Sequence, residues 1–532
     1  MKIQQVTQSG NAGASSLSPD GRYIVYVTHD GAQESLWVRQ VATGGNIQVI
    51  PPEQAHYVAV SFTPDGNYVM FVRSDKSTVN FRYLYQMPVL GGTPQRLLRD
   101  IDSAPAFSPD GRQIAFVRGI LDPPGNNILI ANADGSEERL VSARIGFPPG
   151  SAAVSWSADG QTLAVVSPET RDGNFRWVVM TISVQTGAAR DLHAFNASAQ
   201  ALAWLPDGRG VLVVATDLES GRGQIFFVSY PEGEVSRFTN DLTNYSLCCM
   251  EVTRDGNSLV ALQDTTSSDI WVAKADGSEA RQVTSGAPLG LGLDWIGNQI
   301  VAANSRFQWM LMKPDGSDST PLTNDRDPHL QLSACPDGKH VSYTTWHNGT
   351  LQLWRANSDG SNAKKFDVGS LVGGGLCSWD SKSVFYASDK GLWEVPIEGG
   401  TPVKLNLPFA VYASSRDGKL RLTGSQRLDG DSYVAQMVVV PAAGGKPLKT
   451  FDAPYGLQTG SFTPDSSAIA FLINRNHATN IWEQKLSGGD PIQITKFTSG
   501  DMFAFAWSGD GRQLAFSRGQ RKSDVVMISN FH

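Results

Sequence analysis

The chain has 532 residues, of which 41% are hydrophobic and 18% charged, and its formal net charge is −7. This composition excludes a disordered chain, and the acidic balance excludes the basic footprint of a nucleic-acid-binding protein. The length exceeds one ordinary core, so at least two folded units are expected. No apolar run approaches the ~20 residues of a membrane helix, and the start, MKIQQVTQSG, has no signal-peptide-like apolar segment. We therefore expect no membrane insertion within this chain.

A short phrase with an Asp-Gly pair recurs along the chain and marks the predicted elements in order. It first reads LSPDGRYIVYV, then FTPDGNYVMFV and FSPDGRQIAFV, and the last copy is WSGDGRQLAFS. Proline presets φ for a turn, Asp tolerates the next position, and Gly supplies the left-handed residue that follows. The flanks are rich in the β-branched and aromatic residues that strands favour. Each copy predicts a β-hairpin, and the twelve copies are centred on Asp20, Asp65, Asp110, Asp159, Asp207, Asp255, a degenerate Ile296, Asp337, Asp380, Asp417, Asp465 and Asp510.

A second turn follows each copy except the last and completes a four-stranded unit. It is a Gly-Gly or Asp-Gly pair, as at Gly44-Gly45 and Asp134-Gly135, with looser versions at Gly187 and Gly233. Each unit thus reads strand a, Asp-Gly turn, strand b, variable loop, strand c, glycine turn, strand d. Asp20 and Asp510 are 490 residues apart across eleven intervals, a mean period of about 44.5 residues. A period of about 40–45 residues is that of a propeller blade.

Twelve blades exceed the usual four to eight of a single ring. The sequence therefore predicts an all-β fold of two tandem six-bladed β-propellers with four-stranded antiparallel blades. We expect the first propeller to span residues 1–277 and the second residues 278–532, because the degenerate copy at Ile296 follows soon after this point.

The two ends of the chain predict how a ring closes. The chain ends on a strand c, SDVVMISNFH, and begins with KIQQVTQSG, which matches the d strands of other units. The N-terminal strand is therefore expected to close a ring by strand exchange, which hides an exposed edge. Two arrangements remain open for residues Arg281 to Thr284. Either this strand leaves the sixth unit to complete the twelfth, or it pairs locally and the N-terminal strand crosses to the second ring.

The chain contains four cysteines, Cys248, Cys249, Cys335 and Cys377, with no metal-binding spacing. Cys335 stands where other copies of the phrase carry Ser or Thr, and Cys377 where several carry Phe or Trp. We expect small buried thiols here rather than metal ligands or a redox pair.

These repeats resemble the WD40-like, or PD40, β-propeller repeats of the TolB family, and they are similar to the propeller of the prolyl oligopeptidase and dipeptidyl peptidase group. Segments such as LYQMPVLGGTPQRLLRD, NILIANADGSEERLV and SSDIWVAKADGSEARQVTSG look like the C-terminal sensor region of acidobacterial serine/threonine protein kinases. The resemblance covers nearly the whole chain. It implies an extracytoplasmic or periplasmic double propeller, tethered through an upstream transmembrane helix in a longer parent. It brings neither an established ligand nor catalytic residues.

The sequence lacks the catalytic motifs of serine hydrolases and protein kinases. It has no Gly-x-Ser-x-Gly of hydrolases, no kinase His-Arg-Asp or Asp-Phe-Gly, and no phosphate-binding glycine loop. Its histidines fall at different places in their units, and only His347 and His477 share the b–c loop. One carboxylate per Asp-Gly turn cannot supply the six to eight oxygens of a calcium site. We therefore predict no enzyme activity, no metal site and no cofactor.

Ligand binding is expected on the face that carries the variable b–c and d–a loops, because variable loops on a rigid scaffold are where binding residues concentrate. Exposed aromatic residues beside amides and Arg are common in recognition surfaces, although they are also ordinary loop residues. The candidates are Asp122, Asn126, Asp241, Asn244 and Tyr245 in the first ring, and Trp346, His347, Asn348, Asn474, Arg475 and His477 in the second.

The predicted function is non-catalytic binding of an unknown protein, peptide or small-molecule ligand by the sensor region of a receptor-like serine/threonine kinase. Two alternatives stay open, a TolB-like periplasmic envelope scaffold and a propeller lyase or glycan-active enzyme. Nucleic acid is not an expected partner.

Overall fold

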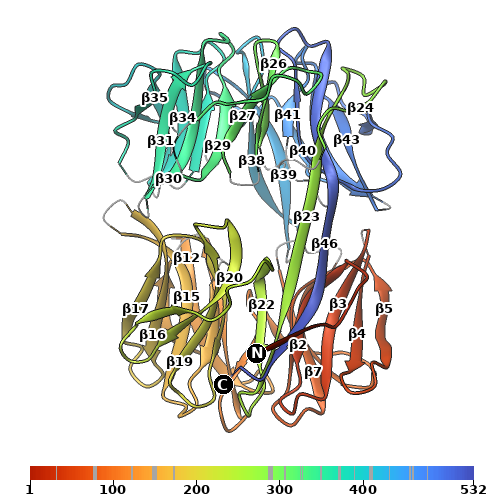
Figure 1. The fold of residues 1–532 in the computed structure, drawn as a ribbon, viewed down its shortest axis with the longest axis vertical. Helices are drawn as coiled ribbons and strands as arrows, with labels where there is room; N and C mark the ends of the chain where they lie inside the picture. The colour runs from red at the N-terminus through yellow and green to blue at the C-terminus, as the bar shows by residue number, and fades with distance from the viewer. Residues whose placement is uncertain are drawn as a thin grey trace. The chain divides into compact units, whose positions relative to one another are not determined.

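The protein is described here by a computed structural model. It describes residues 1–531 except 32, 76–80, 122–123, 147–151, 172–173, 286–291, 305–306, 324, 326, 348–349, 370–372, 389, 406–410, 430–431, 455–456, 458–459 and 476. The described residues form 46 β-strands and no helix, so the predicted all-β class is confirmed (Figure 1). Ten antiparallel sheets have four strands each, and one has six.

No helix long and apolar enough to cross a bilayer occurs in the described part of the chain.

The chain divides into two compact units, each of which is a six-bladed propeller. The first contains Met1–Arg171, Arg176–Thr265 and Lys522–His532, and the second contains Asp172–Phe175 and Thr266–Arg521. This division differs from the expected boundary after residue 277. Residues 266–277 belong to the second unit, and the C-terminal residues from Lys522 return to the first.

Five blades of the first propeller are formed by consecutive strands. They are β2 (Ala12–Leu17), β3 (Tyr23–Asp30), β4 (Gln33–Gln40) and β5 (Asn46–Glu53); β6 (Ala55–Phe62), β7 (Tyr68–Asp75), β8 (Tyr83–Pro88) and β9 (Gln95–Arg99); β10 (Ala106–Phe107), β11 (Gln113–Leu121), β12 (Pro124–Asn132) and β13 (Arg139–Ile145); β14 (Ala153–Trp156), β15 (Thr162–Arg171), β16 (Asn174–Ser183) and β17 (Ala189–Phe195); and β18 (Ala199–Trp204), β19 (Gly210–Asp217), β20 (Arg222–Ser229) and β21 (Val235–Arg237).

Five blades of the second propeller are formed in the same way. They are β25 (Leu293–Ile296), β26 (Gln299–Ala303), β27 (Trp309–Met312) and β28 (Thr320–Pro321); β29 (His329–Ala334), β30 (His340–His347), β31 (Thr350–Asn357) and β32 (Lys364–Lys365); β33 (Gly373–Cys377), β34 (Ser383–Ser388), β35 (Gly391–Pro396) and β36 (Val403–Lys404); β37 (Val411–Ser414), β38 (Leu420–Asp429), β39 (Ser432–Pro441) and β40 (Lys449–Asp452); and β41 (Gly460–Phe462), β42 (Ala468–Arg475), β43 (Ala478–Lys485) and β44 (Ile492–Gln493).

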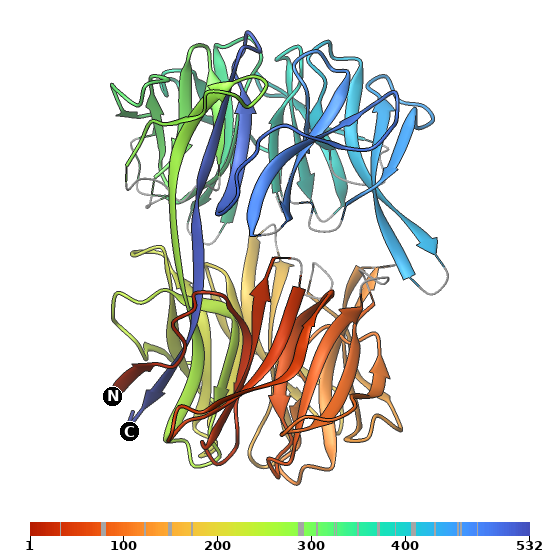
Figure 2. The same ribbon diagram turned by 90° about the vertical axis from the view of Figure 1, so that its right-hand side faces the viewer.

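The six-stranded sheet supplies the remaining blade of each ring. Its strands are β1 (Lys2–Gln5), β22 (Tyr245–Val252), β23 (Ser258–Lys274), β24 (Arg281–Gln282), β45 (Asp501–Trp507) and β46 (Gln513–Ser529). In the first ring, β22, the start of β23, the end of β46 and β1 form one blade; in the second, β45, the start of β46, the end of β23 and β24 form the other. The long strands β23 and β46 are neighbours in this sheet and run side by side in both views (Figures 1 and 2).

The N-terminal strand closes a ring by strand exchange, as predicted, and this ring is the first one, which the sequence left undecided: Lys2 pairs with Ser529 and Gln5 with Val526. The strand at Arg281 combines the two arrangements left open. It keeps its local partner β23, and that pair together completes the twelfth blade rather than the sixth. The difference lies in the b–c connection, because Ser258–Lys274 continues as one 17-residue strand instead of turning back.

The repeated Asp-Gly phrase forms the same turn in most blades. The Ser18 hydroxyl donates to Asp20 Oδ1 at 2.7 Å, and the same oxygen accepts the Arg22 amide at 3.0 Å. Gly21 has φ of 71°, where a side chain would be strained. In the third blade, hydrogen bonds from the Ser108 hydroxyl and the Arg112 amide lower the pKa of Asp110 below its usual value. The repeated aspartates are therefore turn residues.

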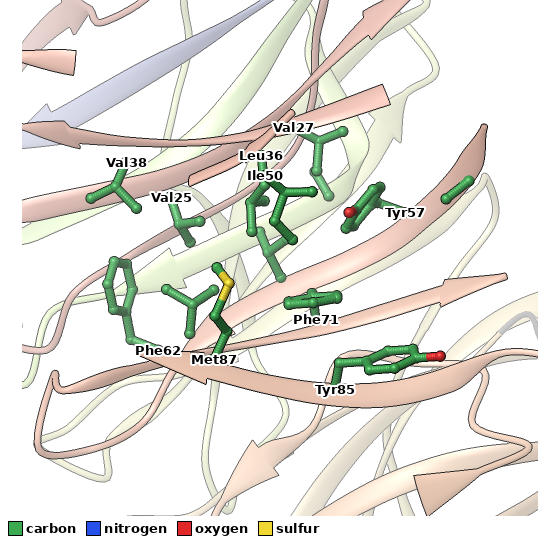
Figure 3. Close-up of a cluster of buried hydrophobic side chains, with 14 of the residues drawn as sticks. Val25, Val27, Leu36, Val38, Ile50, Tyr57, Phe62, Phe71, Tyr85 and Met87 are labelled. Carbon is green, nitrogen blue, oxygen red and sulfur yellow. The ribbon is translucent and has the colours of Figure 1, made fainter. Parts of the chain in front are cut away.

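The core of each propeller lies between neighbouring blades. Figure 3 shows one such cluster between the first two blades, in which Val25 and Leu36 face Phe71 and Met87. These four side chains are fully buried, and burying each one stabilises the fold by roughly 1.5–3 kcal/mol. The first strands of neighbouring blades also contact each other, as β22 does with β18 and β2. Six such strands therefore surround the axis of the ring.

Candidate ligand-binding channel

The first propeller encloses a cavity along its axis. It has a volume of about 470 Å³ and is lined by the first strand of every blade, namely β2, β6, β10, β14, β18 and β22. Small-molecule sites typically have 300–1,000 Å³ and are formed before the ligand arrives. A ring of packed blades fixes these six walls, so the cavity is a preformed site of suitable size.

Five buried polar atoms of residues that line this cavity have no hydrogen-bond partner in the described part of the chain. They are the hydroxyls of Ser15, Ser16 and Ser61 and the indole nitrogens of Trp156 and Trp204. Each of these residues is more than nine-tenths buried. A buried donor left unpaired costs about 1–3 kcal/mol, and most buried polar groups in native proteins are paired. These atoms are covered by the surrounding protein, so they lie behind the surface of the channel rather than facing into it.

The channel also contains a carboxylate, Glu251, on β22. It is partly exposed to the cavity and makes no hydrogen bond or ion pair with the described part of the chain. Burial raises its pKa from 4.5 to about 7, because no donor or cation offsets the lost hydration. Carboxylates with such shifted pKa values are concentrated at functional sites.

The repeat shows that Glu251 occupies an unusual place. The position two residues before the Ser or Thr of the phrase holds Ser16, Ser61, Ala106, Ser155 and Ala203 in the other blades of the first ring. A serine at this position can accept a hydrogen bond from the next blade, as the Ser155 hydroxyl does from the Trp204 amide at 3.0 Å. A small residue is therefore sufficient for packing, and a glutamate is not required by the fold.

Asp294 in the second propeller provides a contrast, since the strand register places it at the corresponding position on β25. Its two carboxylate oxygens accept the Trp295 amide at 2.8 Å and the Ala334 amide of the next blade at 2.9 Å. Burial still raises its pKa, to about 6. Asp294 therefore joins two blades, whereas Glu251, which is one methylene longer, joins none.

A disulfide between the adjacent residues Cys248 and Cys249 also lines the channel. It lies in the part of β22 where the pairing with β23 is irregular, between Tyr245 and Met250. A bond between neighbouring residues closes almost no loop, so it constrains the unfolded chain very little. Its effect is local, because it fixes the shape of the strand next to Glu251.

The expectation of free, buried thiols is wrong for all four cysteines. Cys335 and Cys377 form a second disulfide, with their Cα atoms 5.2 Å apart. Their separation of 42 residues is close to one repeat period, which places Cys335 directly after β29 and Cys377 at the end of β33, in adjacent blades. The period therefore brings two distant cysteines within bonding range.

The sequence-predicted residues of the first ring stabilise loops of their own blades. Asp241 accepts the Thr243 amide at 2.8 Å and the Tyr245 hydroxyl at 2.9 Å. Asn244 accepts the Gly223 amide at 2.7 Å, and Tyr245 is buried. Asn126 is fully buried and donates to the Ile145 carbonyl at 3.0 Å. Asp122 lies outside the described residues.

The predicted residues of the second ring lie mainly at the ends of strands b and c. Trp346 is buried rather than exposed, and its indole nitrogen has no partner within the described chain. His347 Nδ1 lies 2.6 Å from Asp327 Oδ2, and Asn348 lies outside the described residues. Asn474 donates to Thr479 and to Asp501, each at 3.2 Å.

Arg475 and His477 share the turn between β42 and β43 with Asn474, so the structure brings these three together. The guanidinium of Arg475 lies 4.4 Å from the ring centroid of Trp482, and His477 is exposed with φ of 63°. In the described ranges, no group of three or more His, Cys, Asp or Glu side chains is placed to hold a metal ion.

Comparison with known families connects this geometry to a type of propeller. Residues 2–144 match the PD40 family model, described as the TolB beta propeller domain. The repeats within these residues are similar to those of TolB. A protein TolB homolog of Chlorobium chlorochromatii is 32% identical over 104 residues, which cover 19% of this chain and 22% of that protein. The match thus spans about a fifth of the TolB homolog.

Two solved structures show a more distant likeness to this chain. TolB from Acinetobacter baumannii is 15% identical, with 63% of this chain and 76% of that chain covered and a TM-score of 0.30. The GH74 enzyme of Niastella koreensis is 10% identical, with 98% and 91% covered and a TM-score of 0.35. Both TM-scores are below 0.5, so nothing about function follows from either.

Proposed function

We propose that this TolB-type double propeller is a non-catalytic binding scaffold, and that it serves as the extracytoplasmic sensor region of a receptor-like serine/threonine kinase. The observation that carries the binding function is the channel of the first propeller, whose lining includes the carboxylate of Glu251 with no partner in the described chain. A preformed cavity loses little entropy when a ligand enters it.

An extracytoplasmic location is supported by the two disulfides, since such bonds persist in oxidising compartments and are rare in the bacterial cytosol. The kinase assignment is supported by the resemblance of NILIANADGSEERLV and related segments to kinase sensor regions. A gene that reads in frame from a kinase and a membrane helix into this chain would support the assignment. A TolB-like envelope scaffold is the second candidate, which the family match over residues 2–144 favours.

Blocking the channel tests the binding function. Ala106 on β10 lines the cavity and is only partly buried, so Ala106→Trp would fill the space with an indole. Val235→Trp, on the exposed outer strand β21, is the matched control. Native mass spectrometry of the purified chain is expected to show a non-covalent ligand that the control retains and Ala106→Trp loses. Equal ligand content in both variants would refute binding in the channel.

A further inference from the structure

We propose that the channel of the first propeller binds a small molecule with a primary ammonium group, and that Glu251 is the residue that receives it. This inference rests on the proposed binding function and names the class of ligand. Three observations carry it: Glu251 lines the cavity, it has no partner in the described chain, and the other blades of its ring have Ser or Ala at its position.

The first step concerns charge. An ionised carboxylate in a poorly hydrated site is unfavourable unless a cation or several donors accompany it. The described lining contains two other charged residues, Asp102 and Arg254. Asp102 is already bonded to Arg82 at 3.0 Å and to the Gly119 amide at 2.8 Å. Arg254 is exposed at the turn after β22. Glu251 is therefore the lining carboxylate whose charge is left unpaired.

The second step concerns why the carboxylate is there. Asp294 shows that an acidic residue at this position of the repeat can be used by the fold, because it accepts two backbone amides. Glu251 accepts no backbone amide in the described chain. The other blades of its ring have Ser or Ala at this position. A structural requirement does not account for Glu251, whereas a cationic ligand supplies the missing partner.

The third step concerns the rest of the ligand. The cavity of about 470 Å³ has room for more than an ammonium group, and Glu251 lines it together with small and apolar residues. The channel therefore suits a small primary amine, such as an amino alcohol or an amino sugar.

Matched pairs of probes test the proposal on the full chain by isothermal titration calorimetry. Ethanolamine and glucosamine are compared with ethylene glycol and glucose, which have a similar shape and no amine. Each amine is expected to bind at least about tenfold more tightly than its neutral counterpart, a difference of about 1.4 kcal/mol. Equal affinity for amine and neutral probe would overturn the proposal.

Variants assign the effect to Glu251. Glu251→Gln is expected to reduce amine affinity by about tenfold or more and to leave the neutral probes unchanged. Asp294→Asn, in the other propeller, is expected to bind the amines as the unaltered chain does. If Glu251→Gln does not fold, the number of protons released when an amine binds to the unaltered protein tests the proposal instead. At about pH 6, binding of ethanolamine that ionises Glu251 releases close to one proton per molecule bound, and at about pH 8.5 almost none. No pH-dependent proton release would contradict the proposal.

The Ala106→Trp variant separates failure of this inference from failure of the binding function. A ligand that is lost from Ala106→Trp but is not a cation would refute the ammonium proposal and retain the channel as a binding site. A channel that releases no ligand and binds no probe would refute both.

Discussion

The strongest prediction concerns how protein stability depends on pH through Glu251. Its pKa is about 7 in the folded chain and 4.5 when exposed. Below about pH 4.5 both states are protonated, and Glu251→Gln is expected to match the unaltered protein. Between about pH 4.5 and 7 the folded state holds a proton that the unfolded state has lost, so the free energy of unfolding falls as the pH rises. The group's contribution to stability is therefore lost as the pH passes the folded pKa.

The magnitude follows from the size of the pKa change. One unit corresponds to about 1.4 kcal/mol, so a rise from 4.5 to about 7 corresponds to roughly 3 kcal/mol. Above about pH 8 the Glu251→Gln variant is expected to be more stable than the unaltered chain by up to that amount. Urea denaturation at several pH values, followed by tryptophan fluorescence, measures the difference. It should persist in high salt, because desolvation rather than long-range repulsion causes it. A difference independent of pH would refute the reasoning.

Three further predictions concern the fold. Ser18→Ala removes the hydroxyl that accepts the Tyr23 amide at 2.9 Å, so urea denaturation should show a loss of about 1–2 kcal/mol, and Ser18→Thr should retain most of it. Replacing both Cys335 and Cys377 by Ala opens a link across 42 residues and should lower stability by about 2–4 kcal/mol in calorimetry; unchanged stability would contradict the disulfide. Deleting β1 should raise hydrogen exchange of residues 526–529 by tenfold or more and leave blades of the second ring unchanged.

Much of the fold could be predicted because the turn phrase carries its own geometry. Ser18, Asp20 and Gly21 adopt the turn that their residue types favour, and the same bonds recur in other blades. The period then gives the number of blades. The path of the chain through β23 was harder to predict, because residues that favour turns, the Asp and Ser of QDTTSSD, lie inside the continuous strand Ser258–Lys274.

The candidate site could be predicted less well, because the predicted binding residues were those of the variable loops. Asp241 and Tyr245 were singled out by residue type, yet they bond to each other and hold a loop in place. Glu251 lies on a strand and belongs to no motif. A comparison of the copies of the turn phrase would have singled it out, because a glutamate replaces Ser or Ala at one position of the repeat. Cys335 and Cys377 could also have been paired from their spacing of nearly one period.

The sharing of β23 and β46 has a consequence for synthesis of the protein. A nascent chain emerging from the ribosome can complete five blades of the first ring early, but the sixth lacks its outer half until Lys522 and the residues after it have been translated. The ring that is started first is thus finished last, and its gap exposes apolar surface throughout translation of the other. A premature stop just before Lys522 would leave the second ring with all its strands and the first with a missing wall.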